Sequence, residues 1–276
     1  MSEGGFETIR WSLDDGLATI TLARPDKRNA VNQAMFEELR RATAVAGDDP
    51  AVRAVLVDGE GPSFCAGIDL SLIGELAGLA NGGDFSIFVQ MAQRPFRRLA
   101  LMPKPSVAAV QGHALGAGFQ LALACDLRVA AEDVRFGMLE TRYGIIPDLG
   151  GMHQLARLVG PARAKELVWT ARTLDAEEAE RIGLASEVVD GDRLRDRAHE
   201  LARSVMANSP TAVGLAKGLI GHAFDTPLDR EFDLEAEAQQ IALSSQDHRE
   251  SVAAFLEGRP PRFSPSTGNR EESLDS

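Results

Sequence analysis

The chain has 276 residues, of which 44% are hydrophobic and 25% charged, as in a globular protein with one large domain or two small ones. Its net charge of −12 argues against nucleic-acid binding. Two cysteines, without a CxxC motif or a histidine cluster, predict neither a disulfide framework nor a metal site. No apolar run is long enough to span a bilayer, and the N-terminus lacks the pattern of a signal peptide. We therefore expect a cytoplasmic protein without membrane contact.

The first part of the chain predicts strands that alternate with a helix. Apolar residues alternate over 9–13 and 17–22 on both sides of Asp14-Asp15-Gly16, which indicates a hairpin. Asn32 is the predicted N-cap of the next helix. The apolar run 52–57 then predicts a buried strand, so we expect a βαβ arrangement.

The middle of the chain predicts a buried strand that leads into a glycine-rich turn. Residues 84–101 have helical periodicity, which Pro95 is expected to break or kink. The strand over 106–110 is followed by three glycines and a buried helix over 119–124. A helix that starts beside small residues leaves backbone N–H groups unpaired. These groups can bind an anion or a developing oxyanion.

The last third predicts mostly helices, so we expect a sheet-based core followed by a helical module. Asp175 is expected to cap a helix over 177–182 and to form a capping box with Glu178. The predicted domains are a core that carries the site (1–200), a helical C-terminal module (201–263) and a disordered polar tail (264–276). Other helices are predicted over 154–160, 162–170, 193–207, 211–224, 228–243 and 247–256, and a strand over 185–189.

Two carboxylates after the glycine turn are candidate bases. Glu140 and Asp148 lie in mostly apolar sequence, where burial raises the pKa of a carboxylate and lets it act as a base near neutral pH. Asp148 is equally well explained as a helix N-cap. Two further side chains have ordinary structural explanations: Cys65 as a small buried thiol, and His113 as a strand-end residue bonded to the backbone.

Three segments of the chain resemble the crotonase superfamily, the enoyl-CoA hydratases and isomerases. They are SFCAGIDL (63–70), AAVQGHALGAGFQLALACD (108–126) and FGMLETRYGIIPDLGG (136–151), in the order and spacing of that family. The resemblance implies an α/β fold with a crotonase-type ββα-repeat spiral core and a C-terminal helical trimerisation module. It also implies a homotrimer or a dimer of trimers, with an acyl-CoA substrate. No separate cofactor is expected, because coenzyme A is part of the substrate.

The resemblance assigns roles to particular positions of this chain. The backbone N–H groups of Ile68 and Ala117 correspond to the two donors that bind the thioester oxygen. Many relatives have glycine at the second position, and alanine can serve there unless its φ is positive. The substrate contacts that it implies are Lys27, Arg28, Ala66, Asp69, Leu70, Gly118 and Arg259, although the first two are equally well explained as a solvated loop.

The family's hydratases use two glutamates, and this chain has only one of them. The second is Glu140, but the first position holds Gln120. An amide can orient a water but cannot take its proton, and losing one of two acid–base groups costs about 10²–10⁴-fold. A double-bond shift needs one base, so we expect an isomerase with Glu140 as the base and Asp148 in support. The alternatives are a hydratase in which Gln120 orients the water, and a non-catalytic acyl-CoA-binding protein.

Overall fold

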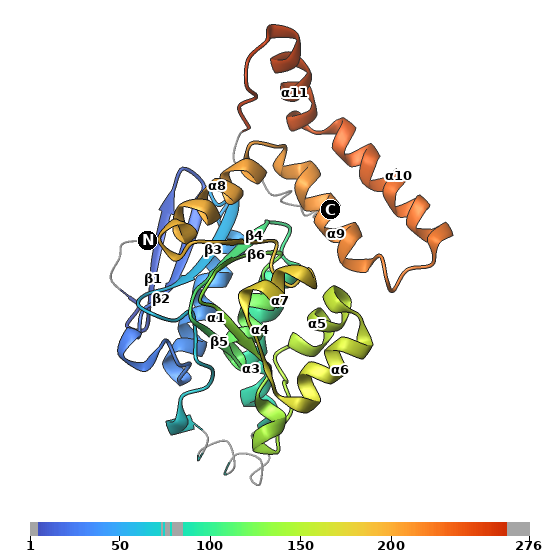
Figure 1. Cartoon of the computed structure of the whole chain (residues 1–276). Coiled ribbons are helices and arrows are strands. Elements are labelled where there is room, and N and C mark those ends of the chain that lie inside the picture. Colours follow the sequence, from blue (N-terminus) through green and yellow to red (C-terminus); the bar gives the residue numbers. More distant parts are fainter. Residues whose placement is uncertain (1–4, 73, 75–77, 79–84, 264–276) are drawn as a thin grey trace, which may run out of the picture.

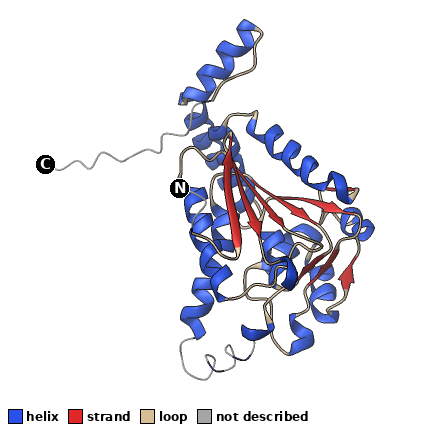
Figure 2. Cartoon of the chain, turned by 90° about the vertical axis from the view of Figure 1, so that its left-hand side faces the viewer, coloured by secondary structure: helices blue, strands red, loops and turns tan. Residues whose placement is uncertain are grey.

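The fold is built on a twisted six-stranded sheet, seen edge-on in Figure 2. The computed structural model describes residues 5–72, 74, 78 and 85–263. The strand order is β1-β2-β3-β4-β6-β9, in which β1 and β2 are antiparallel and the remaining pairs parallel. These strands are β1 (Ile9–Asp14), β2 (Leu17–Leu22), β3 (Ala54–Gly59), β4 (Ser106–Val110), β6 (Leu127–Ala131) and β9 (Glu187–Val189). A three-stranded sheet pairs β5 (His113–Leu115), β7 (Arg135–Gly137) and β8 (Thr173–Leu174).

Helices cover both faces of the large sheet (Figures 1 and 2). The α-helices are α1 (Gln33–Asp48), α3 (Phe85–Leu101), α4 (Ala117–Ala124), α5 (Gly151–Val159), α6 (Pro161–Thr170), α7 (Ala176–Arg181), α8 (Leu194–Met206), α9 (Pro210–His222), α10 (Leu228–Ser244) and α11 (Gln246–Glu257). Short 3₁₀-helices are η1 (Pro25–Lys27), η2 (Glu140–Tyr143) and η3 (Gly191–Arg193). None of the helices in the described residues is both long and apolar enough to cross a membrane.

Side chains alternate between two apolar clusters, one on each face of the sheet. In β3, Val55 and Val57 pack in the larger cluster with α1, α3 and α4, whereas Ala54 and Leu56 pack in the smaller cluster with α8. This alternation is the two-residue period of a strand, and both faces are buried. The large cluster therefore fixes α4, the helix that begins at the glycine turn.

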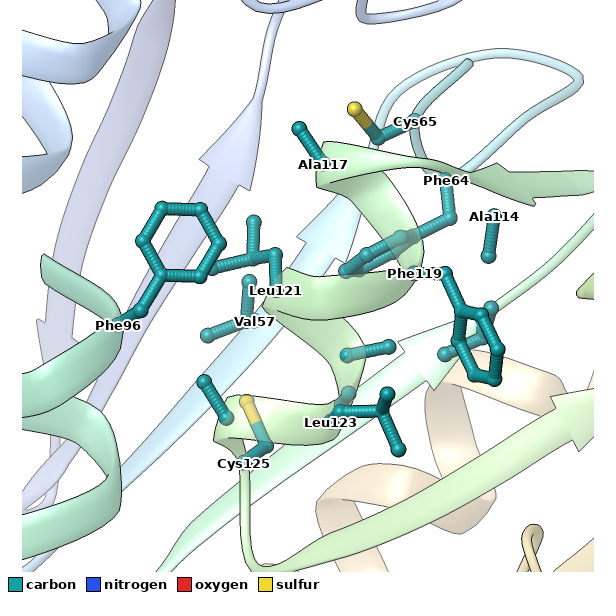
Figure 3. Close-up of a cluster of buried hydrophobic side chains, with 14 of the residues drawn as sticks. Val57, Phe64, Cys65, Phe96, Ala114, Ala117, Phe119, Leu121, Leu123 and Cys125 are labelled. Carbon is teal, nitrogen blue, oxygen red and sulfur yellow. The ribbon is translucent and has the colours of Figure 1, made fainter. Parts of the chain in front are cut away.

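The buried helix α4 is held at both ends. Figure 3 shows Cys65 beside Ala117, at the start of this helix. A methyl group on the next residue, Gly118, would lie only 2.3 Å from the carbonyl oxygen of Cys65, so only glycine permits this contact. After its end, the buried Arg128 donates to the carbonyl oxygens of Ala122 and Cys125 and to two further carbonyls. Burial raises the pKa of the Cys65 thiol to about 12, so the buried-thiol interpretation of Cys65 is supported.

The local predictions for the first part of the chain are confirmed. The hairpin turns at Asp14–Gly16, and β2, α1 and β3 form the expected βαβ unit with β2 and β3 parallel. Asn32 caps α1, because its side chain accepts from the N–H of Met35 at 2.9 Å.

Some local predictions are wrong, and others shift. The helix α3 continues past Pro95, so it does not break there, while the alternative of a kink stays a prediction. Asp175 caps α7 through the N–H of Glu178, but the Glu178 carboxylate accepts from Arg172, so the capping box is incomplete. Helix α4 begins two residues earlier than predicted, and α5 begins at Gly151 rather than residue 154.

The proposed division of the chain at residue 200 falls inside α8, which packs against β3, β4 and β6. Helices α10 and α11 project away from the core in Figure 1. The division into a core and a C-terminal module stays a prediction, and the expected tail over 264–276 lies outside the described residues.

Candidate functional site

Two backbone N–H groups are available where two turns meet. A methyl group on Gly116 would lie 3.9 Å from the Cα of Gly67, so the turns that precede Ala117 and Ile68 are in contact. Neither the Ile68 N–H nor the Ala117 N–H donates to another described residue. Ala117 is helical and has no positive φ, which meets the condition for alanine at this position. Both groups can therefore donate to one oxygen, although that role stays a prediction.

Glu140 lies beside the same turns. A methyl group on Gly116 would lie 3.5 Å from its Oε1, and this oxygen accepts a hydrogen bond of 2.8 Å from Nε2 of Gln120. Its Oε2 is buried and has no partner among the described residues. Burial raises the pKa of Glu140, and the negative charge of Asp148 raises it further. A carboxylate with a raised pKa and one unbonded oxygen can accept a proton near neutral pH.

The Gln120 amide is fixed by backbone donors. Its Oε1 accepts from the N–H groups of Leu149 at 2.9 Å and Gly151 at 3.2 Å. Because these donors face the amide oxygen, the NH₂ group must face Glu140. A methyl group on Gly151 would lie 2.5 Å from Cγ of Gln120, so glycine is needed here. Sequence reasoning missed this contact, and the pair Gly150-Gly151 was its only local signal.

Asp148 is not a helix cap. The N-cap of α5 is Gly150, and no side chain caps that helix, so the capping interpretation is wrong. Burial raises the pKa of Asp148. Its backbone carbonyl accepts a hydrogen bond of 2.6 Å from Nε2 of Gln93 on α3, which sequence reasoning also missed.

Predicted substrate contacts lie on the adjoining loops. The Ala66 N–H donates to the carbonyl oxygen of Arg28 at 2.9 Å, so the loop of Lys27 and Arg28 adjoins the turn before Ile68. Lys27 and Arg28 are exposed and form no ion pair with another described residue. Leu70 is 81% exposed. The structure therefore places four of the predicted substrate contacts at one edge of the candidate site: Lys27, Arg28, Ala66 and Leu70.

Asp69 is already engaged within the chain. Its carboxylate pairs with Arg24 at 2.9 Å and accepts hydrogen bonds from the backbone and side chain of Ser71. Hydrogen bonds from Ser71 and Arg24 lower the pKa of Asp69. This ion pair joins the loop of Arg24 to the turn at Ile68.

Three predicted residues have other surroundings. Gly118 is buried against Cys65. Arg259 follows α11, where it pairs with Glu250 at 2.6 Å, and α11 lies far from α4 in both views. Within one chain, Arg259 is therefore not brought to the site. The ring nitrogen of His113 lies 3.1 Å from the hydroxyl of Ser63, so its partner is a side chain rather than the expected backbone.

In the part of the chain that the structure describes, no group of three or more histidine, cysteine, aspartate or glutamate residues could hold a metal ion.

The chain is similar to known proteins over most of its length. Residues 12–266 match the family model described as enoyl-CoA hydratase/isomerase. A crotonyl-CoA hydratase of Syntrophomonas wolfei is 37% identical over 94% of this chain and 98% of its own length. A 1,2-epoxyphenylacetyl-CoA isomerase of Escherichia coli is 38% identical over 93% and 98%. The crystal structure of an enoyl-CoA hydratase from Bacillus anthracis has a TM-score of 0.87 and 35% identity, and covers 94% of this chain and 100% of that one.

Proposed function

Because the chain belongs to the enoyl-CoA hydratase/isomerase family and has its crotonase-type α/β fold, we propose that it shifts the double bond of a 3-enoyl-CoA to the 2-position. The thioester makes the α-hydrogen acidic, and the reaction needs one base and donors for the enolate oxygen. We assign the base to Glu140 and the donors to the backbone N–H groups of Ile68 and Ala117.

Glu140 acts as that base. Its Oε2 takes a proton from the α-carbon, the electron pair moves to the thioester oxygen, and the N–H groups of Ile68 and Ala117 donate to the resulting oxyanion. One such donor is worth about 2.7–4 kcal/mol in comparable sites. Collapse of the enolate returns the proton from Glu140 to the γ-carbon, so the base is regenerated and the double bond lies next to the carbonyl.

The state of Gln120 is the observation that carries this proposal. Hydration needs a second group that can take or give a proton, and the amide of Gln120 does not act as an acid or a base near neutral pH. Its oxygen is occupied by two backbone N–H groups and its nitrogen donates to Glu140. In this arrangement Gln120 holds Glu140 in place and leaves Oε2 as the one reactive oxygen.

Ultraviolet absorbance of the conjugated enoyl thioester tests the proposal, with 3-enoyl-CoA and 2-enoyl-CoA supplied separately. Rising absorbance from the 3-enoyl substrate is the expected result. A Glu140→Ala variant should abolish it, and retention of most of the activity by that variant would show that another group is the base.

Hydration of a 2-enoyl-CoA is the second candidate, because the S. wolfei relative is named a crotonyl-CoA hydratase. In that reaction the second hydrogen of the Gln120 NH₂ group would orient the water and Glu140 would exchange its proton. Absorbance that falls with the 2-enoyl substrate, without a rise with the 3-enoyl substrate, would favour it over isomerisation.

We further propose that Lys27 and Arg28 contact the anionic end of coenzyme A.

We also propose that the C-terminal helices join copies of the chain into a trimer or a dimer of trimers. Residues of α9 and α10 are nowhere buried, and large apolar side chains such as Phe224, Phe232 and Phe255 are exposed. Light scattering should give at least three times the mass of one chain, and the mass of a single chain would contradict the proposal.

A further inference from the structure

The segment between η2 and α5 carries Asp148 and is held by few hydrogen bonds. It lies between Gly144 and Gly150, whose φ values of 75° and 90° are readily adopted only by glycine. Ile145 and Ile146 are 53% and 65% exposed. Apart from the bond between the Ile145 N–H and the carbonyl of Glu140, the hydrogen bonds of residues 145–149 in the described structure come from two glutamines.

These two glutamines hold the same peptide group from opposite sides. The carbonyl of Asp148 and the N–H of Leu149 belong to one planar unit, and they point in opposite directions because the peptide is trans. Gln93 on α3 donates to the carbonyl at 2.6 Å, and Gln120 on α4 accepts from the N–H at 2.9 Å. Rotation of this peptide would therefore break both hydrogen bonds.

We infer that Gln93 is a positioning residue for Glu140, which acts through the Asp148–Leu149 peptide and Gln120. The inference rests on the proposed role of Glu140 as the base. Three hydrogen bonds in series connect α3 to the carboxylate: Gln93 to the Asp148 carbonyl, the Leu149 N–H to Gln120, and Gln120 to Glu140.

Helix α3 is a suitable anchor for this series. Ala92, Phe96 and Leu99 of α3 are buried in the large apolar cluster, so the backbone that carries Gln93 is fixed by packing. The segment that it holds is fixed only in part, since Leu149 packs in the same cluster and Pro147 is buried, whereas Ile145 and Ile146 are exposed and a glycine lies at each end. Without the Gln93 donor, this peptide loses one of the two hydrogen bonds that orient it, and the bond from the Leu149 N–H to the Gln120 oxygen is weakened.

The test replaces Gln93 by methionine, which has a similar shape but no N–H to donate. Gln90 lies on the same helix and is exposed, so Gln90→Met is the matched control. Misplacement of a catalytic group by about 1 Å can cost about 10²-fold, so we expect kcat of Gln93→Met to fall by about tenfold or more, with KM changed by less than about twofold. Gln93→Glu, which is also unable to donate when ionised, should give the same result.

Two readouts separate positioning from a general loss of structure. Amide hydrogen exchange of residues 145–151 should accelerate in Gln93→Met and not in Gln90→Met. In a double-mutant cycle, Gln93→Met should cost much less in a Gln120→Met background, because both residues act on the same peptide. Additive losses, an unchanged kcat, or equal changes in kcat and KM would overturn the inference.

Hydrogen exchange also distinguishes this inference from the proposed function. If the unmodified protein turned over no 3-enoyl-CoA, the proposed isomerisation would be wrong. The exchange of residues 145–151 would still test whether the hydrogen bond from Gln93 holds the Asp148–Leu149 peptide. If exchange of residues 145–151 were the same in Gln93→Met and the unmodified protein, the positioning role of Gln93 would be disproved even though isomerisation was observed.

Discussion

Replacing Gln120 by glutamate would place a second carboxylate beside Glu140. One oxygen of the new side chain can still accept from the N–H groups of Leu149 and Gly151, because those donors are at 2.9 and 3.2 Å from the present amide oxygen. The other oxygen takes the position of Nε2, 2.8 Å from Oε1 of Glu140. The substitution thus turns a hydrogen bond into a contact between two acids.

The magnitude of the effect follows from this distance. Two unit charges 2.8 Å apart repel by about 6 kcal/mol at an effective dielectric constant of about 20. At 1.36 kcal/mol per pH unit, the pair should therefore keep one proton at neutral pH and titrate in two steps separated by roughly 4 pH units. Two backbone N–H groups favour the ionised form at position 120, so the shared proton resides mainly on Glu140 and blocks it as a base.

The rates of isomerisation and hydration by Gln120→Glu, measured as a function of pH, test this prediction. At pH 7, Gln120→Glu should isomerise 3-enoyl-CoA more slowly than the unmodified protein, and the acid limb of its profile should move to higher pH. Hydration of 2-enoyl-CoA should rise by about 10²-fold or more, because a second acid–base group is now present. Gln90→Glu, an exposed site on α3, controls for the added charge. An acid limb that stays in place would refute the reasoning.

The remaining predictions concern the base and the helix that supports it. Glu140→Gln should lower isomerase turnover by about 10²–10⁴-fold. The raised pKa of Glu140 means that its contribution to stability is full below the unfolded pKa of about 4.3 and is lost as pH rises through the folded pKa. The free energy of unfolding of Glu140→Gln, relative to that of the unmodified protein, should therefore increase between about pH 4 and about pH 7. Urea unfolding that gives the same difference between the two proteins at both of these pH values would contradict this. Gly118→Ala should lower the free energy of unfolding by about 1–3 kcal/mol, because the added methyl group would meet the Cys65 carbonyl at 2.3 Å. Arg128→Met leaves four backbone carbonyls without the donors that Arg128 supplies. It should lower the free energy of unfolding by about 3 kcal/mol or more, as measured by urea unfolding. An unchanged unfolding midpoint in Gly118→Ala or Arg128→Met would contradict the packing described for α4.

Local patterns were sufficient for most elements of the fold. The alternation on both sides of Asp14–Gly16 predicted the β1–β2 hairpin, and Asn32 identified the start of α1, because both depend on residues adjacent in the chain. Pro95 does not break α3, because Phe96 and Leu99 pack in the large apolar cluster and support a continuous helix. The crotonase-type α/β fold and the family were correctly inferred from three conserved-looking segments.

The groups of the candidate site can be named from the amino-acid sequence alone: Glu140, Gln120 in place of a second acid, and the backbone N–H groups that follow two glycine turns. Their contacts with one another depend on how distant segments pack. The contacts of Gln120 with Leu149 and Gly151, and of Gln93 with Asp148, join residues 29, 31 and 55 positions apart in the chain. Such hydrogen bonds depend on how α3 and α4 pack around the segment before α5, and the period of a helix or strand carries no information about that packing.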